Sequence, residues 1–225
     1  MNHNPSSLSS RRQPASGRYR CRYARKAFTL VEVLVVVSII GLLVAVAFTS
    51  VNSALASQRL STAARQLSAD LQNASMIARK ENRPVEVRFY QLPPKDAPGL
   101  NAWRGYQIAV LNDWDASGKA SLTFKTEMQR LPNDVVLMPD ATYNTIAGLT
   151  QKDNTTQSQG GNTGAPVASR YVSYFIHSNG HTTLPAGEPA VLTLVREAPN
   201  GIPATLPADF RSIVIDPKTH QSRVY

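Results

Sequence analysis

The stretch FTLVEVLVVVSIIGLLVAVAF, residues 28–48, decides the fold of this chain. It is apolar along almost its whole length and carries one charged side chain, Glu32. A helix of this length spans about 30 Å, which is the thickness of the hydrocarbon layer of a bilayer. The sequence therefore predicts a transmembrane helix over residues 28–48.

Basic residues before this stretch account for much of the net charge of +9 on the 225-residue chain. No acidic residue lies among them, and after the apolar stretch the next cation is Arg59. Cationic flanks stay in the cytoplasm, so we expect residues 1–27 to be a cytoplasmic leader and the rest to be exported. The basic residues of the leader are Arg11, Arg12, Arg18, Arg20, Arg22, Arg25 and Lys26. From residue 28 onward the charges nearly balance, so the body has no general attraction for nucleic acid.

A cleavable secretory signal peptide is the alternative interpretation of the apolar stretch. Ala45-Val46-Ala47 and Ala54-Leu55-Ala56 both resemble sites cut by signal peptidase. Two features oppose this alternative. The apolar stretch is longer than the roughly 7 to 15 residues of a signal peptide, and an acid such as Glu32 inside it is costly unless it has a function.

The segment Lys26-Ala27-Phe28-Thr29-Leu30-Val31-Glu32-Val33-Leu34, following a basic leader, resembles the processing motif of type IV prepilins and type II secretion pseudopilins. The resemblance implies that prepilin peptidase cuts between Ala27 and Phe28 and methylates the new amine of Phe28. Ala27 stands where the family usually has glycine. Glu32 is implied to neutralise the terminal amine of a neighbouring subunit during filament assembly. The implied partners are prepilin peptidase, other pilin or pseudopilin subunits and an inner-membrane assembly platform.

Helical periodicity continues beyond the apolar stretch. Small or apolar residues recur every three or four positions, which predicts an amphipathic helix over residues 49–83. These residues are Leu60, Ala64, Leu67, Leu71, Ala74 and Ala78. Asn82-Arg83-Pro84 predicts the end of the helix, because the residue before a proline avoids helical backbone. The apolar stripe could cover the protein's own sheet or pair with a second helix in a coiled coil; its shortness and alanine content favour the sheet.

Residues 84–225 have the pattern of a β domain, so the predicted fold class is α+β, with an antiparallel sheet or small sandwich as the head. Val85, Val87 and Phe89 alternate with polar or aromatic residues, as in a half-buried strand. Further strands are predicted at 106–111, 121–128, 135–138, 171–176, 190–196, 211–215 and 221–225. Residues 91–101 and 142–169 are predicted to be surface loops, the second disordered. The only cysteine, Cys21, lies in the leader, so the fold has no internal disulfide.

A long helix followed by a β head resembles the H-type minor pseudopilins and FimT-like minor pilins. Residues 174–180 (YFIHSNG) and 211–217 (RSIVIDP) are similar to the C-terminal half of that group. The overall layout is also similar to the pilin-like cassette protein D of verrucomicrobial bacteria. The resemblance implies a minor subunit of a type II secretion or type IV pilus-like filament. Such a subunit is a single-pass protein of the bacterial inner membrane with its head in the periplasm.

No sequence pattern indicates catalysis or a cofactor, so we do not expect an enzyme: there is no Gly-rich phosphate loop, nucleophile elbow or ordered His, Asp and Ser set. His177, His181 and His220 lack the spacing of a metal site and are predicted to be exposed turn residues. Asn112, Asp113 and Asp115 could offer oxygens to calcium, but a hairpin turn explains them better.

Two alternative functions remain open at this point. Some FimT-like minor pilins take up DNA through basic residues near the C-terminus, and the corresponding candidates here are Arg211, Lys218 and Arg223. An exported β domain could instead bind glycans on an aromatic platform, for which Trp103, Tyr106 and Trp114 are the candidates.

Overall fold

The computed structural model describes residues 28–95, 100–114, 116, 120–154, 169–198 and 201–225, without the side chains of 46–53. The predicted leader, residues 1–27, lies outside the described residues. The chain divides into two compact units, residues 1–47 and 48–225.

The first described element is helix α1 (Leu30–Glu81), and a large antiparallel sheet follows it, which is the α+β class predicted from the sequence. The end of α1 agrees with the predicted stop. Asn82 takes a left-handed conformation with φ of 50°, and the Arg83 N–H donates to the Ala78 carbonyl at 3.2 Å. This is the Schellman arrangement, which satisfies a carbonyl of the last helical turn. Pro84 follows and prevents the helix from continuing.

The strands form one connected sheet in the order β10-β9-β8-β5-β2-β1-β7-β6, with β3 and β4 also paired to β2. The long central strands are β1 (Val85–Leu92), β2 (Ala102–Trp114) and β7 (Arg170–Ile176). The remaining strands are β3 (Ala120–Phe124), β4 (Gln129–Arg130), β5 (Val135–Leu137), β6 (Lys152–Asp153), β8 (Ala190–Arg196), β9 (Phe210–Ile215) and β10 (Ser222–Val224). Each strand predicted from the sequence is present, β3 in shortened form; β4 and β6 were not predicted. The described strands form one hydrogen-bonded antiparallel sheet, and residues of β1, β2, β7, β8 and β9 share one core cluster.

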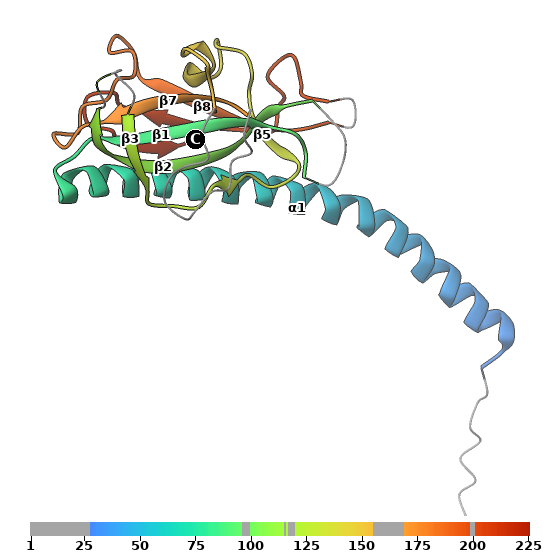
Figure 1. The fold of residues 1–225 in the computed structure, drawn as a ribbon. Coiled ribbons are helices and arrows are strands. Elements are labelled where there is room, and N and C mark those ends of the chain that lie inside the picture. The colour runs from blue at the N-terminus through green and yellow to red at the C-terminus, as the bar shows by residue number, and fades with distance from the viewer. Residues whose placement is uncertain (1–27, 96–99, 115, 117–119, 155–168, 199–200) are drawn as a thin grey trace, which may run out of the picture. The chain divides into compact units, whose positions relative to one another are not determined.

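The C-terminal part of α1 lies along one face of this sheet (Figure 1). All six residues of the predicted apolar stripe are fully buried, and they share one core cluster with Val85, Val87 and Phe89 of β1. Tyr106 of β2 reaches the helix from the sheet, and its hydroxyl donates to Asp70 Oδ2 at 2.5 Å. The stripe therefore covers the protein's own sheet, as the sequence favoured.

The prediction that β1 is half-buried was wrong, because its outer face is covered as well. Glu86 and Tyr90 point away from α1, yet they are 2% and 1% exposed. The Arg88 guanidinium pairs with Glu86 Oε2 at 2.9 Å and lies over the rings of Tyr171 and Phe124, at 4.5 and 5.4 Å from their centres. Side chains from neighbouring strands thus cover the face of β1 that the two-residue periodicity predicted to be exposed to solvent.

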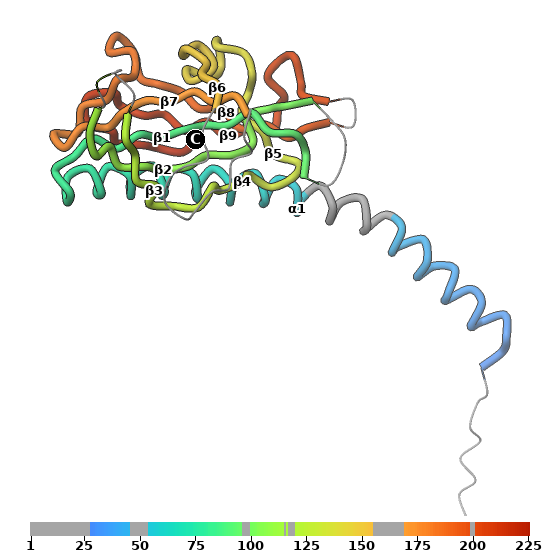
Figure 2. The backbone as a smooth tube through the Cα atoms, viewed as in Figure 1, coloured from blue at the N-terminus to red at the C-terminus, as the bar shows by residue number. Residues whose placement is uncertain are grey.

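The prediction of a disordered loop over residues 142–169 was wrong for its first part. Residues 145–148 form the short helix η1 (Thr145–Gly148), which is followed by β6. Ile146 is fully buried, and the Asn144 side-chain amide donates to the Met138 carbonyl at 2.7 Å. The Thr145 hydroxyl oxygen accepts from the Val191 N–H at 2.8 Å, which fixes η1 to β8. Figure 2 shows this segment at the far side of the head from α1, and Ile146 belongs to the same core cluster as the apolar stripe of α1. Residues 155–168 lie outside the described residues.

The predicted loop over residues 91–101 is shorter than expected. Strand β1 continues through Gln91 and Leu92, with a register shift after Tyr90. Leu92 is fully buried in a small cluster with Tyr90 and Tyr171, against which Met128 packs. The burial of Leu92 explains why β1 continues into a segment whose polar and proline-rich composition predicted a loop.

Candidate processing segment and head surfaces

The described residues of the N-terminal unit form a capped helix. Phe28 and Thr29 precede the first helical residue, Leu30. The Thr29 side-chain oxygen accepts from the Glu32 N–H at 3.2 Å, and the Thr29 carbonyl accepts from the Val33 N–H at 3.2 Å. Thr29 is therefore the N-cap residue, and an acid three positions later completes the sequence pattern of a capping box. Ala27 lies outside the described residues.

Glu32 is an exposed acid in the first turn of an apolar and uncovered helix segment. Every residue from 28 to 45 is exposed, including Phe28 at 77% and Leu30 at 80%. None of the ion pairs formed by the described residues includes Glu32. The carboxylate benefits from its place near the positive end of the helix dipole. The segment thus presents apolar side chains and one acid to whatever surrounds it.

In the part of the chain that the structure describes, no helical stretch is both long enough and apolar enough to cross a lipid bilayer.

The three cations considered for DNA binding do not share one face of the sheet. Arg211 points to the α1 side, where its Nε donates to Ser61 Oγ at 3.1 Å and its Nη1 lies 3.5 Å from Asp209 Oδ1. Arg223 pairs in register with Val214, so its side chain lies on the opposite face. Lys218 is exposed in the turn between β9 and β10. Arg211 is consequently engaged in fastening the helix to the sheet.

The aromatic residues considered for glycan binding do not form a platform. Trp103 and Tyr106 are 2% and 3% exposed, in the core between α1 and the sheet. Trp114 is 53% exposed at the end of β2, and its ring lies 6.0 Å from that of Phe175. A single exposed tryptophan with one neighbouring ring is a smaller surface than the platform expected.

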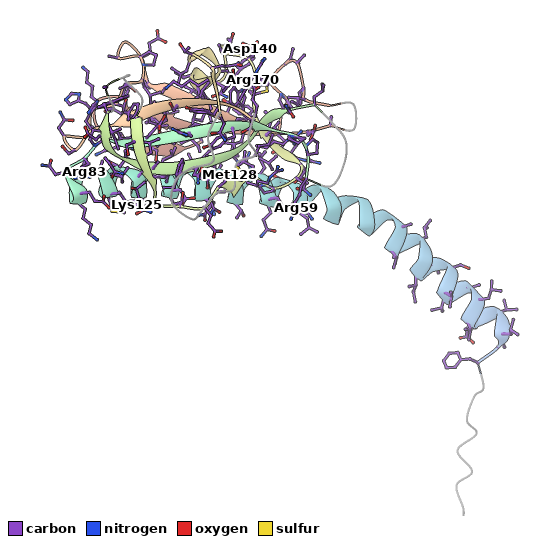
Figure 3. The ribbon with its side chains drawn as sticks, viewed as in Figure 1. Arg59, Arg83, Lys125, Met128, Asp140 and Arg170 are labelled. Atoms are coloured by element: carbon purple, nitrogen blue, oxygen red, sulfur yellow. The ribbon has the colours of Figure 1, made fainter. Side chains whose placement is uncertain are left out.

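The oxygen-bearing residues at the end of β2 belong to a hairpin. Strands β2 and β3 pair antiparallel, with a register shift between Leu111 and Asp113. The Asn112 side chain accepts from Arg83, which is labelled in Figure 3, at 3.3 Å and donates to Thr123 at 2.8 Å. Asp113 Oδ1 accepts from the Trp114 N–H at 2.8 Å. These contacts are local to the hairpin, and Asp115 lies outside the described residues.

The histidines divide into two exposed residues and one buried residue. His177 and His181 are exposed in the turn after β7, as predicted. The prediction for His220 was wrong, since it is 2% exposed and its Nε2 lies 3.0 Å from the Tyr174 hydroxyl. Tyr174 comes from β7, far away in the sequence, so no local pattern indicated this contact. In the described residues, no group of three or more His, Cys, Asp or Glu side chains could hold a metal ion.

Sequence reasoning also missed the buried polar cluster on the outer face of the central strands. The Tyr90 hydroxyl donates to Gln107 Oε1 at 3.1 Å, beside the Glu86–Arg88 pair. Burial raises the pKa of Tyr90 to about 12, so its hydroxyl stays protonated. The cluster depends on cross-strand neighbours, and each member by itself is an ordinary polar strand residue. No signal in the sequence marks it.

Comparison with known proteins gives one match. Residues 22–48 match the family model described as the prokaryotic N-terminal methylation motif. No curated protein matches the chain, and no solved structure matches it. The matched residues include Phe28, Thr29 and Glu32, which form the capped start of α1. This motif indicates a type IV pilin-like protein that is processed by prepilin peptidase.

Proposed function

We propose that this chain is a minor pseudopilin, a low-abundance subunit of a type II secretion or type IV pilus-like filament. Prepilin peptidase cuts the bond between Ala27 and Phe28 and methylates the amine of Phe28. The methylation-motif match over residues 22–48 supports this proposal. The helix start supports it too, since α1 begins at Leu30, two residues after the proposed new terminus.

The observation that carries the proposal is a single acid, Glu32, near the start of an otherwise apolar and uncovered helix segment. Isolated in an apolar environment, a carboxylate costs free energy unless it is paired. Cleavage would create an amine at Phe28, and the amine of a neighbouring subunit would offset this cost. The pair would then form only in the polymer, and it would set the register between subunits.

Anchorage of residues 28–48 in the inner membrane is part of the proposal and rests on the sequence. The basic residues before Phe28 favour a cytoplasmic N-terminus and a periplasmic head. In the described head, the C-terminal part of α1 covers the sheet of its own chain and shares one core with it. The outer surfaces of the head are then free to meet the assembly platform and other subunits.

The experiment compares processing with polymer incorporation in cells that express Glu32→Ala, Glu32→Asp and the control Ser38→Ala. Ser38 lies in the same segment and its hydroxyl donates to the Leu34 carbonyl, so its loss leaves the acid in place. We expect Glu32→Ala to be cut normally but to fall at least tenfold in the sheared filament fraction. Glu32→Asp should retain part of the incorporation because it keeps the charge. Unchanged incorporation of Glu32→Ala would refute the assigned role.

A further inference from the structure

The turn that follows β7 places two histidines opposite each other. The His177 N–H donates to the His181 carbonyl at 2.8 Å, and the His177 carbonyl accepts from the Gly180 N–H at 2.9 Å. Gly180 has a φ of +89°, a left-handed conformation that suits glycine. Ile176 and Thr182 form an antiparallel bridge just below. This is a three-residue hairpin loop closed by a glycine bulge.

Opposed residues in such a hairpin point to the same face. Ile176 is fully buried on the α1 side, so the flanking position, His177, points to the outer side, and His181 is its cross-strand partner. Directly opposed residues have Cβ atoms about 4.5 to 5.5 Å apart. Both histidines are exposed. Two imidazoles at this separation can turn their nitrogens toward one ion.

The exposed pair has the chemistry of a two-nitrogen chelate. Imidazole suits Cu²⁺ and Zn²⁺, and affinity among divalent first-row metals is highest for Cu²⁺. His220 cannot join as a third ligand, because it is buried and its Nε2 contacts Tyr174. Water would fill the other coordination positions.

The guanidinium of Arg79 lies close to the turn. Its Nη2 is 3.3 Å from the position that a Cβ on Gly180 would occupy. Positive charge nearby weakens the electrostatic attraction of any dication. Hard ions such as Mg²⁺ and Ca²⁺ are disfavoured further, because they prefer oxygen ligands to imidazole nitrogens.

We propose that His177 and His181 form a surface site for a transition-metal ion of the Cu²⁺ or Zn²⁺ class. The site is independent of the proposed filament function, since it depends only on the closed turn at the end of β7. The spacing of the histidines in the sequence gave no support for a metal site. The cross-strand pairing in the structure brings the two side chains to the same face of the hairpin.

The test is titration of the purified full chain with CuCl₂, without an affinity tag, in a His3→Ala background. That background leaves His177, His181 and His220 as the only histidines. We expect one equivalent of Cu²⁺ to bind and its electron paramagnetic resonance spectrum to show coupling to two imidazole nitrogens. His177→Ala and His181→Ala should each weaken binding at least tenfold. ZnCl₂ should compete for the site.

Gly180→Ala provides a matched variant that keeps both imidazoles. Alanine is strained at a φ of +89°, and its Cβ would meet Arg79, so the turn must change. We expect weaker Cu²⁺ binding with both histidines present and with circular dichroism unchanged. If His177→Ala and His181→Ala bind Cu²⁺ as tightly as their parent, the ion is adventitious and the proposal is overturned. A spectrum with coupling to one nitrogen only would overturn it as well.

Discussion

His220 is a buried histidine held in an uncommon backbone conformation. Its φ is 55°, its Nε2 faces the Tyr174 hydroxyl, and its Nδ1 has no hydrogen-bond partner in the described structure. Burial, with a smaller contribution from the positive charge of Arg79, lowers the pKa of His220 to about 4. Burial also raises the pKa of Tyr174. The folded chain therefore holds both groups neutral near pH 7.

The lowered pKa of His220 predicts acid sensitivity of the fold. An unfolded histidine takes up a proton near pH 6.5, whereas the folded one does so only near pH 4. Stability should therefore fall as the pH drops from about 6.5 to about 4, with a contribution from this residue of roughly 3 kcal/mol. Urea unfolding between pH 7 and pH 4 measures the loss.

The variant His220→Asn isolates this contribution. Asparagine tolerates the left-handed backbone conformation and does not titrate. Carboxylates also titrate toward pH 4, so the informative quantity is the difference in slope between the two proteins. Equal loss of stability in both would contradict the assignment of acid sensitivity to His220.

At the level of elements, α1 was the most predictable part of the head. Residues such as Leu67 and Leu71 recur with the 3.6-residue period, and that period alone identifies the face that becomes buried. The outer face of β1 was not predictable in the same way. Glu86 and Tyr90 are buried by partners on β2, β3 and β7, and those partners depend on strand register rather than on local pattern.

The buried stripe of α1 predicts a large loss of stability on truncation. Leu67 is fully buried between the helix and the sheet, so Leu67→Ala should lower the free energy of unfolding by about 2 to 5 kcal/mol. Arg65 is exposed on the same helix, and Arg65→Ala should change it by no more than about 0.5 kcal/mol. Urea unfolding of the two variants provides the comparison. Similar values for both would mean that α1 does not pack on the sheet as described.

At the scale of the whole molecule, the sequence predicted the class of the fold but not its strand order. The three-residue strand β5 joins β2 on one side to β8 on the other and so connects the two halves of the sheet. Val135 and Leu137 are buried. A short apolar run predicts a buried strand, but it does not specify which two strands pair with it. Long-range pairing of this kind is decided by the packing of the complete chain.

The candidate sites also differ in whether contiguous residues or long-range pairing define them. The methylation motif could be recognised because its residues are contiguous, and the family match covers Phe28 and Glu32; the cleavage site and the role of Glu32 stay predictions. The opposed histidines 177 and 181 required the turn geometry. The separation of Arg211 from Arg223 required the register of β9 with β10. The N-terminal motif can thus be recognised from contiguous residues, whereas the head surfaces depend on the strand topology.

Mass spectrometry of the mature N-terminus, on protein isolated from cells with an active prepilin peptidase, is the most direct test of processing at Phe28. We expect a chain that starts at Phe28 with a methylated amine, and an uncut chain when the peptidase gene is deleted. A mature chain that starts at Phe48 or Ser57, whether or not the peptidase is present, would contradict this expectation and indicate an ordinary signal peptide.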